Sequence, residues 1–168
     1  MHGGPACRLP VGAEVFVLRD YHVDNMMLLS DRPGIAACGL LDFQDAVIGP
    51  ASYDLVSLLQ DCRRDIPEPV ISSAMERYFN AMPEIMDRQA FLSSYRVLGA
   101  QRHLKVFGIF ARQTVLYGNH GYLVHMPRLW RLTLENLTDE ALAPVREWIE
   151  KHVPESHRVT PPPGGYAA

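Results

Sequence analysis

Acidic and amide side chains stand at the ends of the first apolar runs of the chain. The stretch LRDYHVDNMMLL, residues 18–29, places Asp20 and Asn25 five positions apart directly before an apolar run. The stretch GLLDFQDAVIGPASYDL, residues 39–55, places Asp42 directly after one. Isolated acids usually lie on a solvated face, whereas these adjoin segments whose composition predicts burial. The pattern therefore predicts a β element that presents polar groups at its loop ends, on a rigid support.

Three short apolar runs around these residues predict strands: VFVLR (15–19), MMLLS (26–30) and IAACGLL (35–41). The turn-forming segment DRPG, residues 31–34, joins the last two runs and predicts a hairpin. Leu41 ends the third run, so we expect Asp42 to emerge where that strand ends.

From Ser52 onward the apolar residues recur at helical spacing. This spacing predicts helices over residues 52–62, 67–81, 88–117, 127–136 and 139–152, of which 88–117 is one long helix or two with a break near Gly108. We expect residues 1–14 to be a linker or a truncated N-terminus and residues 154–168, with PPPGGYAA, to be disordered. The predicted fold class is α+β, mostly helical with a short N-terminal β element, in one domain over residues 15–153.

Composition limits the classes of function. A chain of 168 residues with 48 % hydrophobic and 21 % charged residues is typical of one globular domain. A net charge of −3 without a basic stripe argues against nucleic acid as a partner. Cys7, Cys38 and Cys62 are widely spaced without a CxxC pair, which favours a reducing cytoplasm over a disulfide framework or a zinc site. No apolar run reaches the about 18 residues that cross a bilayer, so we expect no membrane partner.

The order of the polar residues matches the needs of phosphoryl transfer. That reaction needs a carboxylate to orient the attacking hydroxyl and accept its proton, and oxygen ligands for Mg²⁺ on the nucleotide phosphates. In kinases the catalytic Asp is followed five positions later by Asn, and then by an Asp-Phe-Gly segment. Here Asp20 and Asn25 have this spacing, Arg19 precedes Asp20, and Asp42-Phe43 follows a hydrophobic run.

Two segments, RDYHVDN and LDFQDAVIGPASYDL, make the chain resemble the aminoglycoside phosphotransferase and choline kinase superfamily, which has a protein-kinase-like fold. The catalytic loop of that superfamily reads H-G-D-x-H-x-x-N and its metal segment D-F-x-D-A. The resemblance is specific over about residues 15–62. Together with AQRHLKVFGIFAR, residues 100–112, these segments are most similar to cytoplasmic kinases that phosphorylate N-acetylmuramic acid and N-acetylglucosamine at C1 during cell-wall recycling.

The resemblance implies a role for each matching residue. Asp20 would be the base aimed at the acceptor hydroxyl, and Asn25 and Asp42 would hold Mg²⁺ on the phosphates of ATP. Asp54 would brace the backbone of the catalytic loop, and His22 would orient that loop through its ring nitrogens. The implied partners are a nucleotide and a small-molecule acceptor.

The chain also departs from the superfamily pattern. Leu18 occupies the position of the loop His, Arg19 that of the Gly, and Gln44 stands where protein kinases have Gly, so hydrogen bonds behind the base are expected to differ; Arg19 is counted among the loop-supporting residues. The resemblance covers only the C-terminal lobe. Only nineteen residues precede Asp20, and they contain neither a glycine-rich phosphate loop nor a nucleotide-gripping Lys with its helix Glu. We therefore expect a fragment, or an incomplete member that is completed by a missing or separately encoded N-terminal lobe.

Other interpretations compete with this one. Turn acids and helix caps would also explain Asp and Asn at these positions. Asp20, His22 and Asp24 alternate, so on an extended strand they would share a face and ligate the metal of a hydrolase. A non-catalytic lobe that binds a partner is the remaining alternative. Residues able to line a pocket for an acceptor sugar, as opposed to a solvated helix face, are Arg102, His103, Tyr117 and His120.

Overall fold

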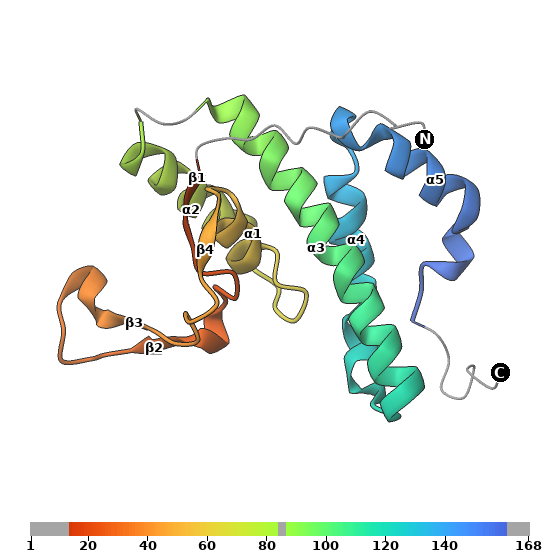
Figure 1. Cartoon of the computed structure of the whole chain (residues 1–168), viewed down its shortest axis with the longest axis horizontal. Coiled ribbons are helices and arrows are strands. Elements are labelled where there is room, and N and C mark those ends of the chain that lie inside the picture. Colours follow the sequence, from red (N-terminus) through yellow and green to blue (C-terminus); the bar gives the residue numbers. More distant parts are fainter. Residues whose placement is uncertain (1–13, 84–86, 161–168) are drawn as a thin grey trace, which may run out of the picture. The chain divides into compact units, whose positions relative to one another are not determined.

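The computed structural model describes residues 14–83 and 87–160, with short strands first along the chain and helices after them (Figure 1). The strands are β1 (Glu14–Val17), β2 (Met26–Leu28), β3 (Cys38–Leu40) and β4 (Val47–Pro50). The α-helices are α1 (Tyr53–Leu59), α2 (Glu68–Ala81), α3 (Arg88–Tyr117), α4 (Met126–Asn136) and α5 (Ala143–His152). Short 3₁₀ helices are η1 (Val23–Asn25), η2 (Gly34–Ala37), η3 (His120–His125), η4 (Glu140–Leu142) and η5 (Glu155–His157). The predicted α+β class is confirmed in this coarse form.

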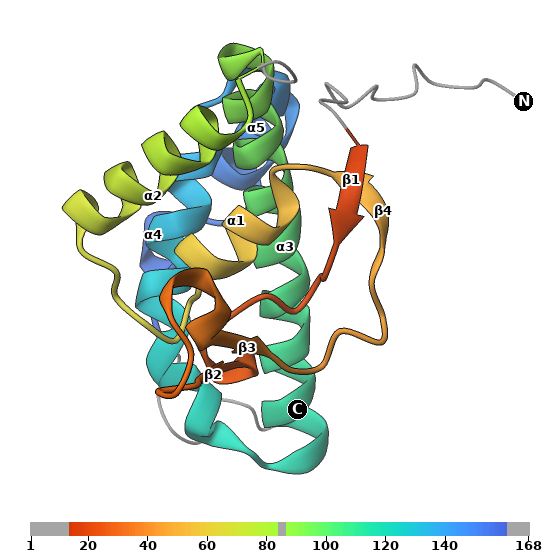
Figure 2. The same ribbon diagram turned by 90° about the vertical axis from the view of Figure 1, so that its left-hand side faces the viewer.

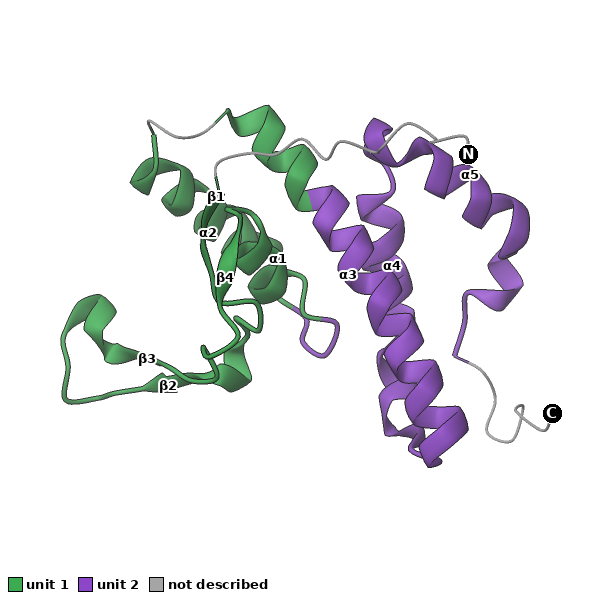
Figure 3. Ribbon diagram, in the orientation of Figure 1, with its two compact units in different colours: residues 1–61, 66–95 green, residues 62–65, 96–168 purple. Residues whose placement is uncertain are grey.

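The chain divides into two compact units, and each is described by itself (Figure 3). Unit 1 comprises residues 1–61 and 66–95, and unit 2 comprises residues 62–65 and 96–168. The sequence predicted one domain. One domain over residues 15–153 stays a prediction. Neighbouring parts of α3 pack with different elements: Phe91 packs on Phe79 of α2, with ring centroids 5.1 Å apart, whereas Val97 shares a core cluster with Leu137.

Unit 1 contains two small antiparallel sheets, which are visible as adjacent strand pairs in Figure 2. In one sheet β1 pairs with β4, with Val15 opposite Gly49 and Val17 opposite Val47. In the other, β2 pairs with β3. The β2–β3 hairpin confirms the predicted one, but residues 34–37 form η2 where the apolar run predicted strand. Strand β4 was missed because VIGP is short and ends in Gly-Pro, which sequence rules assign to turns or edges.

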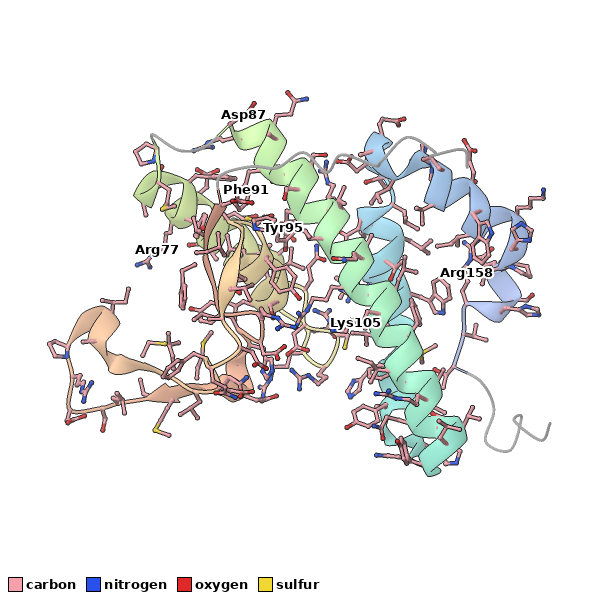
Figure 4. All side chains as sticks on the ribbon, viewed as in Figure 1. Arg77, Asp87, Phe91, Tyr95, Lys105 and Arg158 are labelled. Atoms are coloured by element: carbon pink, nitrogen blue, oxygen red, sulfur yellow. The ribbon has the colours of Figure 1, made fainter. Side chains whose placement is uncertain are left out.

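Helix α1 is held firmly within unit 1, which matters because Asp54 lies in its first turn. Its buried apolar face comprises Leu55, Val56 and Leu59. Around it, the Ser52 and Ser94 hydroxyls are buried and 2.8 Å apart, and the Tyr78 hydroxyl donates to the Ala51 carbonyl at 3.1 Å. Figure 4 shows Phe91 and Tyr95 on the N-terminal part of α3, where both are buried. A well-packed α1 gives Asp54 a fixed position.

Unit 2 is helical and has its own core. Its buried cluster comprises Val97, Ala100, Leu137, Leu142 and Ile149, with Trp130, Val145 and Val153 packed against it. The short segment 62–65 belongs to this unit because the Asp65 carboxylate accepts hydrogen bonds from Arg128 and, at 2.7 Å, from Arg131, both on α4.

Helix α3 runs unbroken from Arg88 to Tyr117, so the prediction of one long helix is confirmed and the alternative break near Gly108 is wrong. The disorder expected from residue 154 onward does not hold for residues 154–160. These residues contain η5, and the Thr160 hydroxyl donates to the Leu123 carbonyl at 3.3 Å. The rest of that tail and residues 1–13 of the expected linker lie outside the described residues. Among the helices of the described ranges, none has the length and apolar character of a membrane span.

Candidate functional site

The loop that leaves β1 is tightly wound by its own backbone. The Asp20 N–H donates to the Leu18 carbonyl at 3.0 Å, the His22 N–H to the Asp20 carbonyl at 3.1 Å, and the Asn25 N–H to the His22 carbonyl at 2.9 Å. We call residues 18–25 the catalytic-loop segment, after the superfamily motif that they resemble. Its hydrogen bonds bring Asp20, His22 and Asn25 close together, as their sequence spacing predicted, and leave Asp20 exposed.

Asp54 holds this segment from α1. Its Oδ2 accepts a hydrogen bond from the Leu18 N–H at 2.8 Å, and its Oδ1 accepts one from the Arg19 N–H at 3.0 Å. Hydrogen bonds from N–H groups to a carboxylate are stronger than those to neutral acceptors.

The Asp54 charge also affects two nearby tyrosines. Burial raises the pKa of the half-buried Tyr78, and the Asp54 charge raises this pKa further. The pKa of Tyr21 is raised by burial, then by Cys38 and then by Asp54.

Arg19 adopts a left-handed backbone conformation, with φ 73°. For a residue with a Cβ this conformation is strained, whereas glycine adopts it freely. The superfamily pattern has glycine here. The Arg19 backbone is fixed on both sides, because its N–H donates to Asp54 and its carbonyl accepts from the Ser57 hydroxyl at 3.2 Å. These two contacts oppose the strain and hold the backbone directly before Asp20, where hydrogen bonding was expected to differ from the superfamily pattern.

The orientation of the Asn25 side chain follows from its partners. One atom of its amide lies 2.9 Å from the Asp20 carbonyl oxygen, which can only accept, so this atom is the NH₂ nitrogen Nδ2. The same nitrogen lies 3.5 Å from Nε2 of His22. The other amide atom is therefore the oxygen Oδ1, which is the type of atom that can ligate a hard cation.

Asp42 follows β3 with φ 56°, again in the left-handed region. The residue before it, Leu41, connects this segment to the catalytic-loop segment: its N–H donates a hydrogen bond to the Asn25 carbonyl at 2.9 Å. The exposed Asp42 carboxylate accepts a hydrogen bond from the Gln44 side-chain NH₂. A carboxylate and an amide oxygen are hard ligands of the type that Mg²⁺ prefers, so this donor set fits the ion.

One functional contact was missed by the sequence analysis. Ser57 lies three positions after Asp54 on α1, and residues with this spacing share a helix face. Both side chains hold the backbone of Arg19, and the spacing was the signal that could have found Ser57.

The expected acceptor-binding residues lie in the other compact unit of the chain. Arg102 and His103 belong to unit 2. His103 is 1 % exposed, and its Nδ1 lies 3.4 Å from Nδ2 of Asn136 on α4. A buried side chain cannot line an open pocket, so the expectation for His103 is corrected to a core position. Arg102 is partly exposed, and Tyr117 and His120 are exposed, all in unit 2.

The geometry also removes the basis of the hydrolase alternative. Residues 20–22 turn and residues 23–25 form η1, so Asp20, His22 and Asp24 do not share one face of a strand. Within residues 14–83 and 87–160 there is no group of three or more His, Cys, Asp or Glu side chains that would hold a metal ion.

Known proteins are similar to this chain in sequence. A model of the phosphotransferase enzyme family matches residues 5–88. The N-acetylmuramate/N-acetylglucosamine kinase of Caulobacter vibrioides is 41 % identical over 146 residues, which are 87 % of this chain and 40 % of that protein. The proteins of the same name from Pseudomonas aeruginosa and Neisseria meningitidis are 41 % and 42 % identical over 70 % and 68 % of this chain, and 35 % and 34 % of their own lengths. The chain thus spans less than half the length of these relatives. It belongs to the phosphotransferase enzyme family.

Proposed function

We propose that this chain carries the catalytic loop and the metal-binding segment of an ATP-dependent kinase that phosphorylates a hydroxyl of an amino sugar. The observation that carries the proposal is the hydrogen-bonded path from Asp20 through Asn25 to the residue before Asp42. This path joins a base candidate and two oxygen ligands in the order that phosphoryl transfer requires. The relatives, named as kinases of N-acetylmuramate and N-acetylglucosamine, support amino sugars as acceptors.

The chain's own residues would divide the work as follows. The exposed Asp20 carboxylate accepts the proton of the acceptor hydroxyl while the hydroxyl oxygen bonds to the γ-phosphorus and the bond from that phosphorus to ADP breaks. Asn25 Oδ1 and the Asp42 carboxylate would hold Mg²⁺, which would offset the negative charge of the phosphate oxygens. Asp54 and Ser57 keep the backbone of Arg19, and hence Asp20, in place.

Large exposed apolar side chains on both sheets of unit 1 and beside them support a second, polypeptide partner. The most exposed of these side chains belong to β1, β2, β4 and the segments beside them: Phe16 at 64 %, Leu28 at 83 %, Ile35 at 93 %, Phe43 at 58 % and Ile48 at 68 %. Large exposed apolar patches usually mark interaction surfaces. The relatives are more than twice as long as their matched parts. The proposed occupant is a nucleotide-binding lobe equivalent to the unmatched part of these relatives, encoded in the same polypeptide or separately.

The decisive experiment starts with the mass of the native polypeptide, measured with an antibody against α4 and α5. A band above 18.9 kDa directs the assay to the longer protein, and a band at 18.9 kDa directs it to complexes captured with this chain. ADP release is then measured with N-acetylmuramate, N-acetylglucosamine and, as a control, an acetylated sugar without a free hydroxyl. Turnover that requires Mg²⁺ and a free hydroxyl supports the proposal. Absence of turnover from the completed protein contradicts it.

A further inference from the structure

The motif assigns functions to Asp20, His22 and Asn25 but none to Asp24, which lies between them in η1. We propose that Asp24 is a positioning residue whose carboxylate selects the tautomer of His22 that fixes the Asn25 side chain with its oxygen outward. The inference rests on the proposed function, since only a metal-assisted transfer needs that oxygen as a ligand.

The argument begins at Asn25. Its NH₂ group lies 2.9 Å from the Asp20 carbonyl and 3.5 Å from His22 Nε2. An amide NH₂ group can donate two hydrogen bonds and cannot accept one. One hydrogen goes to the carbonyl, and the second points to the ring only if Nε2 presents its lone pair. The neutral His22 ring must then carry its proton on the other nitrogen, Nδ1.

This tautomer needs support, because a neutral histidine side chain in water favours the proton on Nε2. His22 Nδ1 is buried and, within the described residues, has no hydrogen-bond partner. The His22 side chain as a whole is 15 % exposed, so water solvates this N–H poorly. A buried N–H without an acceptor costs free energy, which leaves the Nδ1–H form unfavourable unless an acceptor lies near.

Asp24 supplies that acceptor. Its Oδ2 lies 4.0 Å from His22 Nδ1, and its side chain is 45 % exposed. Closing this gap by about 1 Å would bring the carboxylate within hydrogen-bonding distance. A carboxylate behind one ring nitrogen fixes which nitrogen carries the proton, as it does behind metal-ligating histidines. Asp24, His22 and Asn25 thus form a relay, in which each side chain sets the orientation of the next and the last presents Oδ1.

The tautomer is measurable in this chain alone, without metal or nucleotide. We would record the ¹⁵N shifts of the His22 ring nitrogens at about pH 8.5, where histidine is ordinarily neutral, and identify them by their loss in His22→Asn. We expect the His22 proton on Nδ1 in the wild type and on Nε2 in Asp24→Ala. In Asp24→Asn we expect it on Nδ1, because the amide oxygen of Asn can still accept a hydrogen bond from that N–H. The matched control is Asp31→Ala, which removes another exposed aspartate, in the turn of the β2–β3 hairpin, and should leave the wild-type signals unchanged.

A wild-type ring protonated on Nε2, or an Asp24→Ala spectrum identical to the wild type, would overturn the proposal. The wild-type measurement needs no variant, so a variant that fails to fold does not block the test.

A kinetic readout separates this inference from the proposed function. In the active, completed protein, Asp24→Ala should raise the Mg²⁺ concentration at half-saturation about threefold, the scale of one exposed charged contact, while kcat at saturating Mg²⁺ stays nearly constant and Asp24→Asn restores the Mg²⁺ dependence. Turnover with an unchanged Mg²⁺ dependence refutes the positioning role and leaves the kinase proposal standing. The expected tautomer without any turnover refutes the kinase proposal and leaves the tautomer assignment standing.

Discussion

The Asp54 carboxylate accepts a hydrogen bond at 3.0 Å from the backbone N–H of Arg19, a residue 35 positions earlier in the chain. With the 2.8 Å bond from Leu18, this contact fixes the catalytic-loop segment to helix α1. The contact joins a strained backbone position to a well-packed helix, and several predictions of stability and activity depend on it.

Replacing Asp54 should detach the loop from α1. Asp54→Ala leaves two backbone N–H groups without their acceptor, and we expect a loss of about 1–3 kcal/mol in the free energy of unfolding. Asp54→Asn keeps one accepting oxygen and should lose about half as much. Urea denaturation checks the order, with Asp45→Ala as the control for removing an exposed acid nearby. Equal stability of Asp54→Ala and Asp45→Ala would contradict the bracing role.

The left-handed conformation of Arg19 predicts an unusual preference for glycine. Arg19→Gly and Arg19→Ala both remove the side chain, but only glycine relieves the strain at φ 73°. The greater freedom of glycine in the unfolded chain cancels part of this gain. We therefore expect Arg19→Gly to be more stable than Arg19→Ala by about 1 kcal/mol. Thermal and urea unfolding of the two variants measure this difference. An alanine variant as stable as the glycine variant would show that the backbone is not strained there.

The raised pKa of Tyr78 predicts a loss of stability in alkaline solution. The folded chain holds the phenol proton more firmly than the unfolded chain does, so the contribution is complete below the ordinary value of 10.0 and is lost as the pH rises through the folded-state pKa. Ultraviolet titration of tyrosinate should show a late-titrating group that disappears in Tyr78→Phe. Because Asp54 is the second cause of the shift, Asp54→Asn should make Tyr78 titrate earlier, whereas Asp45→Asn should not.

Asp20 should matter for turnover and not for folding. In the completed protein, Asp20→Asn removes the proton acceptor and should lower kcat by about 10²–10⁴-fold, the usual contribution of a general base. Its exposed side chain makes little contribution to the core, so the free energy of unfolding should change by less than about 0.5 kcal/mol. Steady-state kinetics and urea denaturation of the same preparation check both statements. Undiminished turnover would remove Asp20 from the chemistry.

Local patterns predicted local structure well. The spacing of apolar residues gave the bounds of α3, and the five-residue spacing of Asp20 and Asn25 placed them in one wound loop, because both are properties of neighbouring residues. Contacts between residues far apart in the sequence were harder to predict. The pairing of β4 with β1 and the burial of His103 against Asn136 depend on partners that periodicity cannot identify. The resemblance pointed to Asp54, whereas the left-handed turn at Arg19 became visible only in the backbone.

The hydrogen bond from the Leu41 N–H to the Asn25 carbonyl closes the base of the β2–β3 hairpin, just beyond the Met26–Leu40 pair. The residues of β2, η2 and β3 all lie between Asn25 and Leu41, the two residues that this hydrogen bond joins. Insertions or deletions near the turn at residues 30–34 would therefore lengthen or shorten the hairpin without changing the distance in space between Asn25 and Asp42. The hairpin is thus a place where the chain can take a longer or shorter turn while Asn25 and Asp42, the proposed metal ligands, keep their relative positions.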